Sequence, residues 1–180
     1  MMPIQVTQYA KGMNILSPVY LDANFLISFM HTSHSKYFSA RELFFELYAQ
    51  KVEIFISTLT IDEFWWGILR EWHRAKTGTD IRARDIKTNP SILHAYANNL
   101  RQDTSNMLRW MNTTFLPTDL VATRNVIEYA LDLQIQEGIM PRDSFHVALA
   151  VLSKSKGFIT SDSDFDNLSL SEGNLIVYKF

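Results

Sequence analysis

The chain has 180 residues, of which 47% are hydrophobic and 20% are charged, and its formal net charge is -2. This composition is that of an ordinary globular protein, so it argues against intrinsic disorder and against a generic nucleic-acid coat. The absence of cysteine excludes a disulfide framework and a thiolate zinc site, and it is typical of a reducing compartment. The chain shows no secretory signal pattern and no apolar run of membrane-spanning length, so we expect a cytoplasmic protein that contacts no membrane.

The first half of the chain alternates between predicted strands and helices. The segment PVYLD, which ends at Asp22, is short and apolar like a buried strand, and a helical period follows in residues 39–50. Residues 52–57, VEIFIS, are β-branched and aromatic, which is typical of a second buried strand. Residues 60–75 then show a helical pattern. The order strand, helix thus occurs twice.

The second half continues the alternation. Helical patterns cover residues 90–112 and 119–136, and TFLP at 114–117 predicts a short strand between them. Residues 140–157 predict a helix with Pro141 in its first turn and Gly157 as its stop signal. The apolar segments FIT and LIVYK that follow predict two more strands.

Alternating strands and helices predict a central parallel sheet covered on both faces, which is a three-layer α/β/α sandwich. We find no repeat, low-complexity tract or linker, so we expect a single domain over residues 1–180. It would carry an N-terminal extension, about residues 1–17, and an enlarged helical middle, about residues 70–112.

Three acidic residues follow predicted strands, at the edge of the sheet where open parallel sheets bind ligands, and a fourth, in the first turn of a helix, would face the same edge. Asp22 follows VYL, Glu63 lies early in the helix after IFIST, Asp143 opens a later helix, and Asp162 follows FITS. We expect these carboxylates to meet. Such a cluster repels itself unless it binds cations, and carboxylate oxygens favour hard ions such as Mg²⁺ or Mn²⁺.

Each acid also has a structural explanation, in which it stabilises the start of a helix. Thr60 and Glu63 form a T-x-x-E capping box, and Ser163 with Asp166 forms a similar S-x-x-D pattern. Asp22 can cap a helix that begins near Asn24. Asp143 lies where a negative charge favours a helix N-terminus. Taken singly, each acid is better explained as structural; their shared place at strand ends favours a site.

The stretch ITSDSDFDNL contains three alternating aspartates, which raises the question of a calcium loop. An EF-hand loop that starts at Asp162 requires Gly at its sixth position and Glu at its twelfth, but Asn167 and Gly173 stand there. We therefore exclude it. His146 lies one turn beyond Asp143, and the apolar run FHVALAVL favours a packed helix histidine over a site residue.

Three segments, YLDANFLI, STLTIDEFWWGIL and PRDSFHVALAVLSKSKGFITSDSDF, resemble the successive motifs of PIN-domain proteins, especially the VapC-like toxin ribonucleases. The resemblance covers most of the chain in the expected order. The acidic positions of that family match Asp22, Glu63, Asp143 and Asp162, while Asp164 matches a position that is acidic in many members. Asn24 and Thr160 match polar positions that support the site.

The resemblance implies hydrolysis of RNA phosphodiester bonds with Mg²⁺ or Mn²⁺ as cofactor. Asp22, Glu63, Asp143 and Asp162 would be catalytic and metal-binding, and Asp164 would add a metal ligand. It also implies a type II toxin–antitoxin pair, with RNA as substrate, an antitoxin protein as partner and a homodimer. Two alternatives stay open at this point: a noncatalytic binding module on the PIN scaffold, and an α/β phosphotransfer enzyme that uses Asp22 as its nucleophile.

Two surfaces are candidates for partners. Residues 70–87 hold six basic residues against three acidic ones, a local charge of +3 that suits an RNA backbone or a solvated surface equally well. Phe45 and Trp66 lie off the main apolar faces of their predicted helices. They predict either packing on a neighbouring helix or an interface with another protein.

Overall fold

The computed structural model describes residues 2–111, 114–116, 124–170 and 174–180. The described elements, in chain order, are β1 (Met2–Pro3), β2 (Gln5–Gln8), β3 (Val19–Leu21), α1 (Ala23–Met30), α2 (Tyr37–Ala49), β4 (Ile54–Ile56), α3 (Thr58–Thr77), α4 (Ala83–Thr88), α5 (Ser91–Met111), β5 (Thr114–Phe115), α7 (Arg124–Glu137), α8 (Pro141–Leu152), β6 (Gly157–Thr160), the 3-10 turn η1 (Ser163–Phe165), β7 (Ser169–Leu170) and β8 (Ile176–Lys179).

The central sheet has the strand order β2-β8-β6-β3-β4-β5, and every neighbouring pair in it is parallel. In the middle of the sheet, Leu21 of β3 is aligned with Ile159 of β6, so both strands end at the same edge. Strands β1 and β7 form a separate antiparallel pair. The predicted parallel sheet is therefore confirmed, and β5 confirms the short strand expected in TFLP; Pro117 lies outside the described residues.

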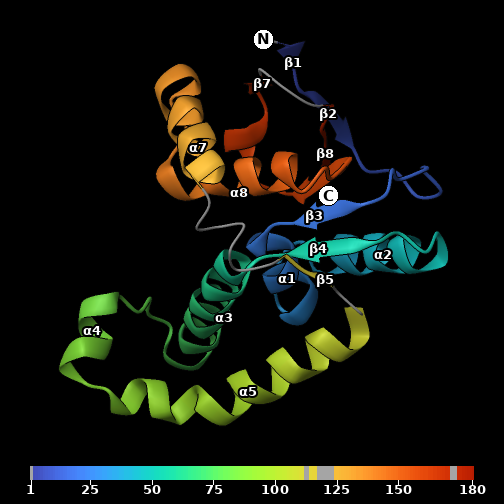
Figure 1. Ribbon diagram of the computed structural model, residues 1–180. Coiled ribbons are helices and arrows are strands. Elements are labelled where there is room, and N and C mark those ends of the chain that lie inside the picture. Colours follow the sequence, from blue (N-terminus) through green and yellow to red (C-terminus); the bar gives the residue numbers. More distant parts are fainter. Residues whose placement is uncertain (1, 112–113, 117–123, 171–173) are drawn as a thin grey trace.

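Helices cover both faces of the sheet, which confirms the predicted α/β/α fold (Figure 1). On one face α1, α2, α3 and α5 pack through a cluster of buried residues that includes Phe25, Leu47 and Phe64. On the other face α7 and α8 pack through a second cluster around Val147 and Phe158. Both sides of the strands are thus buried, as the continuous apolar segments VYL and GFIT require.

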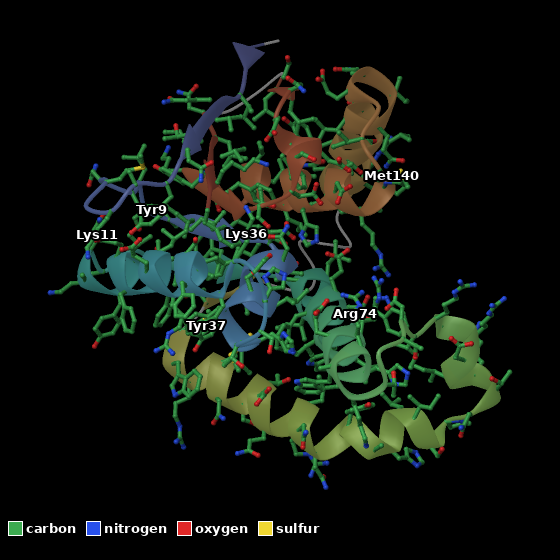
Figure 2. The ribbon with its side chains drawn as sticks, turned by 180° about the vertical axis from the view of Figure 1, so that it is seen from behind. Tyr9, Lys11, Lys36, Tyr37, Arg74 and Met140 are labelled. Atoms are coloured by element: carbon green, nitrogen blue, oxygen red, sulfur yellow. The ribbon has the colours of Figure 1, made fainter. Side chains whose placement is uncertain are left out.

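The N-terminal extension contributes the strand β2, which sequence analysis did not predict. β2 pairs in parallel with β8 along the sheet edge, from Gln5 opposite Ile176 to Gln8 opposite Lys179. The segment QVTQ stays largely exposed, so it carries no apolar signal for a strand. Backbone pairing with β8 makes it a strand. The chain then runs along α2, where Lys11 pairs with Glu42 and the amide of Gly12 donates to Glu46 (Figure 2).

The helix that begins at Pro141 ends sooner than predicted. Pro141 occupies the first helical position as expected, but α8 ends at Leu152, and Lys154, with a φ of 62°, forms the left-handed turn after it. Gly157 is therefore not the stop signal. It is the first residue of β6, where a Cβ atom would lie 2.6 Å from the ring of Tyr178. The close approach of that ring, rather than a helix end, requires glycine here.

The enlarged middle consists of α4, α5 and the end of α3. Trp65 on α3 donates from its indole nitrogen to Thr104 on α5, at 2.9 Å. Within residues 70–87 the acidic residues pair with arginines: Asp80 with Arg70 and Arg74, Glu71 with Arg74, and Asp85 with Arg84. The hydrogen bond from Arg70 lowers the pKa of Asp80 to about 2.

Among the described residues, no helix combines the length and apolarity that a membrane crossing requires.

Candidate active site

Asp22 lies at the carboxyl end of β3 and is the N-cap of α1. One of its carboxylate oxygens accepts a hydrogen bond from the amide of Ala23 at 2.6 Å, and the other accepts from the hydroxyl of Thr160 at 2.7 Å. Asp22 therefore both caps a helix and lies at the edge of the sheet, so the two explanations of this residue do not exclude each other. Asp22 is buried, and burial raises its pKa, a shift that the hydrogen bond from Thr160 opposes and the charge of Glu63 increases.

Thr160 and Asn24 join the ends of the two central strands. Asn24 donates from its amide nitrogen to the Thr160 hydroxyl at 3.0 Å, and its oxygen accepts from the amide of Ser161 at 3.2 Å. The Thr160 hydroxyl also accepts from the amide of Asp162 at 3.0 Å. Because β3 and β6 are parallel neighbours, this cluster holds Asp22 and the loop that carries Asp162 at one edge.

Asp162, not Ser163, caps the short helix that follows β6. Its side chain accepts from the amide of Asp164 at 3.0 Å, so the predicted S-x-x-D cap is wrong. Asp166 is the C-cap of this short helix and is exposed, and one of its oxygens lies 2.7 Å from the ammonium of Lys179. The same ammonium also donates to the carbonyl of Asp162. Lys179 is the last residue of β8, and its buried side chain ties the aspartate loop to the sheet.

Glu63 belongs to the second turn of α3, and the predicted capping box at Thr60 and Glu63 is wrong. The helix begins earlier, with Ser57 as its N-cap, and the capping box consists of Ser57 and Thr60. The side chain of Glu63 takes no part in this capping box and instead contacts residues of another helix. One oxygen lies 2.8 Å from Nε2 of His146, and the other lies 3.6 Å from the guanidinium of Arg142.

His146 is the site residue that sequence reasoning passed over. It is fully buried, as a packed histidine would be, but its ring contacts polar groups on both sides. Nε2 faces Glu63, and Nδ1 lies 2.9 Å from the hydroxyl of Tyr20. Burial lowers the pKa of His146, but the hydrogen bond to Glu63 and the charges of Asp22 and Glu63 outweigh that effect, so its pKa is raised. Its place one turn after Asp143 was the available signal.

Asp143 lies in the first turn of α8 and is partly buried. Burial, followed by the charges of Asp162 and Asp22, raises its pKa to about 6, and Asp164 adds to the shift. Those contributions place Asp143 within electrostatic reach of the other acids. Asp164 itself is exposed.

The arrangement suits a cation. Oxygen atoms of Asp22 and Glu63 and a ring nitrogen of His146 all lie within 4.8 Å of one another. The raised pKa values of Asp22 and Asp143 show that the carboxylates crowd one another and are poorly solvated. A bound divalent ion would offset both costs, and carboxylate oxygens are the ligands that Mg²⁺ and Mn²⁺ prefer. Asp22 and Glu63, two of the five predicted ligands, therefore fit such an ion together with His146.

The aromatic residues of α2 lie outside this edge. Phe45 is 56% exposed, whereas its neighbour Phe44 is buried against Phe29 of α1. Arg41 lies over the rings of both Tyr37 and Phe45. A groove of about 500 Å³ runs beside them, lined by residues of α1, α2 and α5 that include Met30, Tyr48 and Trp110. Trp66 lies in a second groove, of about 580 Å³, between α3 and α5.

A family model and solved structures were compared with this chain. The family model described as PIN domain matches residues 19–170, whereas no curated protein matches the sequence. Among solved structures, VapBC2 from Rickettsia felis, bound to a DNA fragment from their promoter, is 14% identical with a TM-score of 0.51, covering 90% of this chain and 98% of that one. VapC20 from Mycobacterium tuberculosis, a toxin that cleaves the sarcin-ricin loop, is 13% identical with a TM-score of 0.47, covering 82% and 92%.

Proposed function

The chain belongs to the PIN domain family, and from that premise we propose that it is a metal-dependent endoribonuclease acting as the toxin of a toxin–antitoxin pair in the cytoplasm. One observation supports the proposal: oxygen atoms of Asp22 and Glu63 and a ring nitrogen of His146 lie within 4.8 Å of one another, and the charges of further acids act on this edge of the sheet. Asp143, on α8, responds to the charges of Asp22 after β3 and Asp162 after β6, and Asp22 responds to Glu63 of α3. Acids that served only to cap helices would have no reason to lie near one another.

Asp22, Asp143 and Asp162 would hold the cation, which we propose to be Mg²⁺ or Mn²⁺, with Glu63 and Asp164 as further acidic contacts. When bound, such an ion lowers the pKa of an attacking water and stabilises the charge that develops on the phosphate. Thr160 keeps Asp22 oriented by the hydrogen bond described above. Asp162 is held by its loop, because Lys179 binds its carbonyl oxygen and Thr160 accepts from its amide.

Arg142 supports a phosphate-containing substrate. It is exposed, it directly precedes Asp143, and its guanidinium contacts Glu63 and, at 3.5 Å, Asp62. A guanidinium at the rim of an acidic site can bind the phosphate backbone while the acids bind the cation. The excess positive charge of residues 70–87 would add a sequence-independent contact.

The phosphotransfer alternative is weaker, because it uses Asp22 alone as a nucleophile and gives no role to Glu63 and His146, which lie with it within 4.8 Å. A noncatalytic PIN module would need none of the electrostatic crowding at Asp143.

For the partner, we propose that an antitoxin, or a second copy of the chain, covers the exposed aromatic side chains of α2.

The decisive test replaces single acids with their amides. Asp143→Asn and Asp162→Asn should each lower metal-dependent RNA cleavage by more than the about 100-fold that outer partners of metal sites cost, because an amide removes the charge that holds the cation. Asp132→Asn is the matched control, since Asp132 is exposed on α7. Cleavage of total RNA is measured with Mg²⁺, Mn²⁺ or chelator, together with circular dichroism as a check of folding.

The same variants are followed by thermal melting with and without Mn²⁺. A cation that binds the native state raises the melting temperature, and the increase should shrink in Asp143→Asn and Asp162→Asn but not in Asp132→Asn. Full cleavage activity in both site variants would end the nuclease assignment and leave helix capping as the role of these acids.

A further inference from the structure

A chain of polar groups leads from the core of the protein to the carboxylate of Glu63. It begins at Ser57 and Thr60 in the capping box of α3, whose hydroxyls lie 2.6 and 3.0 Å from the hydroxyl of Tyr20. It continues from Tyr20 to Nδ1 of His146, and from Nε2 of His146 to Glu63. Ser57, Thr60, Tyr20 and His146 are all fully buried.

The chemistry of the last link sets the proton positions in the rest of the chain. An ionised carboxylate only accepts hydrogen bonds, so Nε2 of His146 must carry the proton that it shares with Glu63. The hydroxyl of Tyr20 lies against Nδ1; it donates to Nδ1 in the neutral ring and accepts from it in the protonated ring. Burial raises the pKa of Tyr20, so its hydroxyl keeps its own proton in both cases. Both ring nitrogens are therefore engaged, and the ring has one orientation.

Glu63 needs such a support because its own helix provides none. It sits in the second turn of α3, past the capping box, with a long side chain that is partly exposed. Ordering a free glutamate side chain costs conformational entropy. The bond to His146 places one oxygen, while the exposed Arg142 lies near the other.

We propose that His146 is a positioning residue that fixes the Glu63 carboxylate beside Asp22, ready to receive the divalent cation of the proposed nuclease. Its Nε2–H donates to Glu63, and Tyr20 holds the ring. The inference rests on the proposed function for the cation, but it makes a claim of its own about how this chain prepares Glu63.

Two other roles compete. The nitrogen of His146 lies close enough to Asp22 and Glu63 to bind the ion directly. Direct binding would require Nε2 to lose its proton and to give up the 2.8 Å contact with Glu63. Alternatively, the polar chain only fills the core. The three roles differ in which His146 variant restores cation binding.

The experiment uses two amide variants of the full-length protein. In His146→Gln the side-chain NH₂ reaches about as far as Nε2, so it can still donate to Glu63. In His146→Asn the amide reaches only the place of Nδ1 and leaves Glu63 without its donor. We expect Asn to weaken Mn²⁺ binding by about 10–100-fold, the usual cost of losing a partner of a metal ligand, and Gln to restore it to within about 3-fold of wild type.

His73→Gln is the matched control, because Nδ1 of His73 also faces a tyrosine hydroxyl, that of Tyr96 at 3.4 Å, in the later part of α3. Mn²⁺ affinity is measured by titration calorimetry, and His73→Gln should leave it unchanged. A double-mutant cycle with Glu63→Gln adds the sharper test. If His146 acts through Glu63, His146→Asn should have almost no further effect once Glu63 is replaced.

Side-chain ¹⁵N NMR of the wild type gives a readout that needs no variant. We expect Nε2 of His146 to stay protonated when Mg²⁺ is added. Loss of that proton would assign direct ligation, and additive effects in the cycle would assign a role independent of Glu63; either result overturns the proposal. Equal affinity in all variants would leave only core packing. RNA cleavage is scored separately, so an inactive wild type that retains the coupling would reject the nuclease and not the positioning role.

Discussion

Asp143 shows most clearly how neighbouring carboxylates of the proposed metal site affect the stability of the folded protein. Its raised pKa of about 6 means that the folded state favours the protonated carboxyl over the charged one. The stability that this preference contributes is present below the ordinary value of 3.8 and is lost as the pH rises through 6. At neutral pH the metal-free protein therefore carries an unfavourable charge.

Asp143→Asn should remove that charge and stabilise the metal-free protein at pH 7.5 but not at pH 4. After a discount for partial solvent exposure, we expect a gain of about 1 kcal/mol, or about 2–4 °C in melting temperature. Thermal unfolding in chelator at both pH values measures it, with Asp132→Asn as control. A difference that is the same at both pH values would mean that Asp143 is not crowded by the other acids.

The acidic site residues could be predicted from the sequence, because carboxylates that follow successive strands of a parallel sheet lie at the same edge. Which of these acids also cap helices could not be predicted, because it depends on the residue at which each helix begins. Asp22 does cap α1, but the start of α3 at Thr58 releases Glu63 from the capping box that its sequence suggested. The role of His146 was hidden because its neighbours in the chain are apolar, whereas its partners Tyr20 and Glu63 come from other elements.

At the scale of elements, the loop after β6 depends on β8. Lys179 ends β8 with a buried side chain that binds the carbonyl of Asp162 and pairs with Asp166, whose own side chain is 46% exposed. The two partners are unequal, because the carboxylate of Asp166 can be hydrated when it is left alone and the ammonium of Lys179 cannot.

Asp166→Asn should therefore destabilise the protein more than Lys179→Met, which fills the same space without a charge. We expect about 1–2 kcal/mol for the first and less for the second, measured by urea unfolding. Asp166→Asn should still keep most RNA cleavage activity, since Asp166 is turned toward Lys179. The opposite order of stabilities would show that the exposed carboxylate, rather than the buried ammonium, depends on the pair.

Element types were predictable along most of the chain, because buried strands and amphipathic helices leave different periods. The exceptions have local physical causes. β2 has no apolar alternation because it stays largely exposed, and it is a strand only because β8 offers an unpaired edge. Gly157 looked like a helix stop, but Lys154 makes the left-handed turn, and the glycine admits the ring of Tyr178.

At the scale of the whole molecule, the exposed rings of α2 mark the surface that we assign to a protein partner. Phe44 and Phe45 are adjacent in sequence and differ in exposure, 9% against 56%. Phe44 belongs to the core cluster, whereas the ring of Phe45 lies under Arg41 and is tilted against Phe44. Substitutions at Phe44 and Phe45 can therefore distinguish an effect on folding from an effect on association with a partner.

Phe45→Ala should weaken self-association or antitoxin binding while costing less than about 1 kcal/mol of stability, the worth of an exposed cation–π contact. Phe44→Ala should instead cost about 3–5 kcal/mol through the cavity it leaves. Trp66→Ala tests the groove between α3 and α5 in the same way. Sedimentation and thermal melting are measured on all variants. Unchanged association with a strongly lowered melting point in Phe45→Ala would assign that ring to the core.

The sequence by itself determined the parallel sheet, its two helical layers and the acids at its edge, because these follow from local periodicity and from the rule that parallel strands end together. The extent of the domain, residues 1–180, stays a prediction. Only the tertiary structure decided the strand order, the edge strand β2, the Lys179 anchor and the link from Tyr20 through His146 to Glu63. Those features join residues that are far apart in the chain, so they depend on packing geometry that no local pattern encodes.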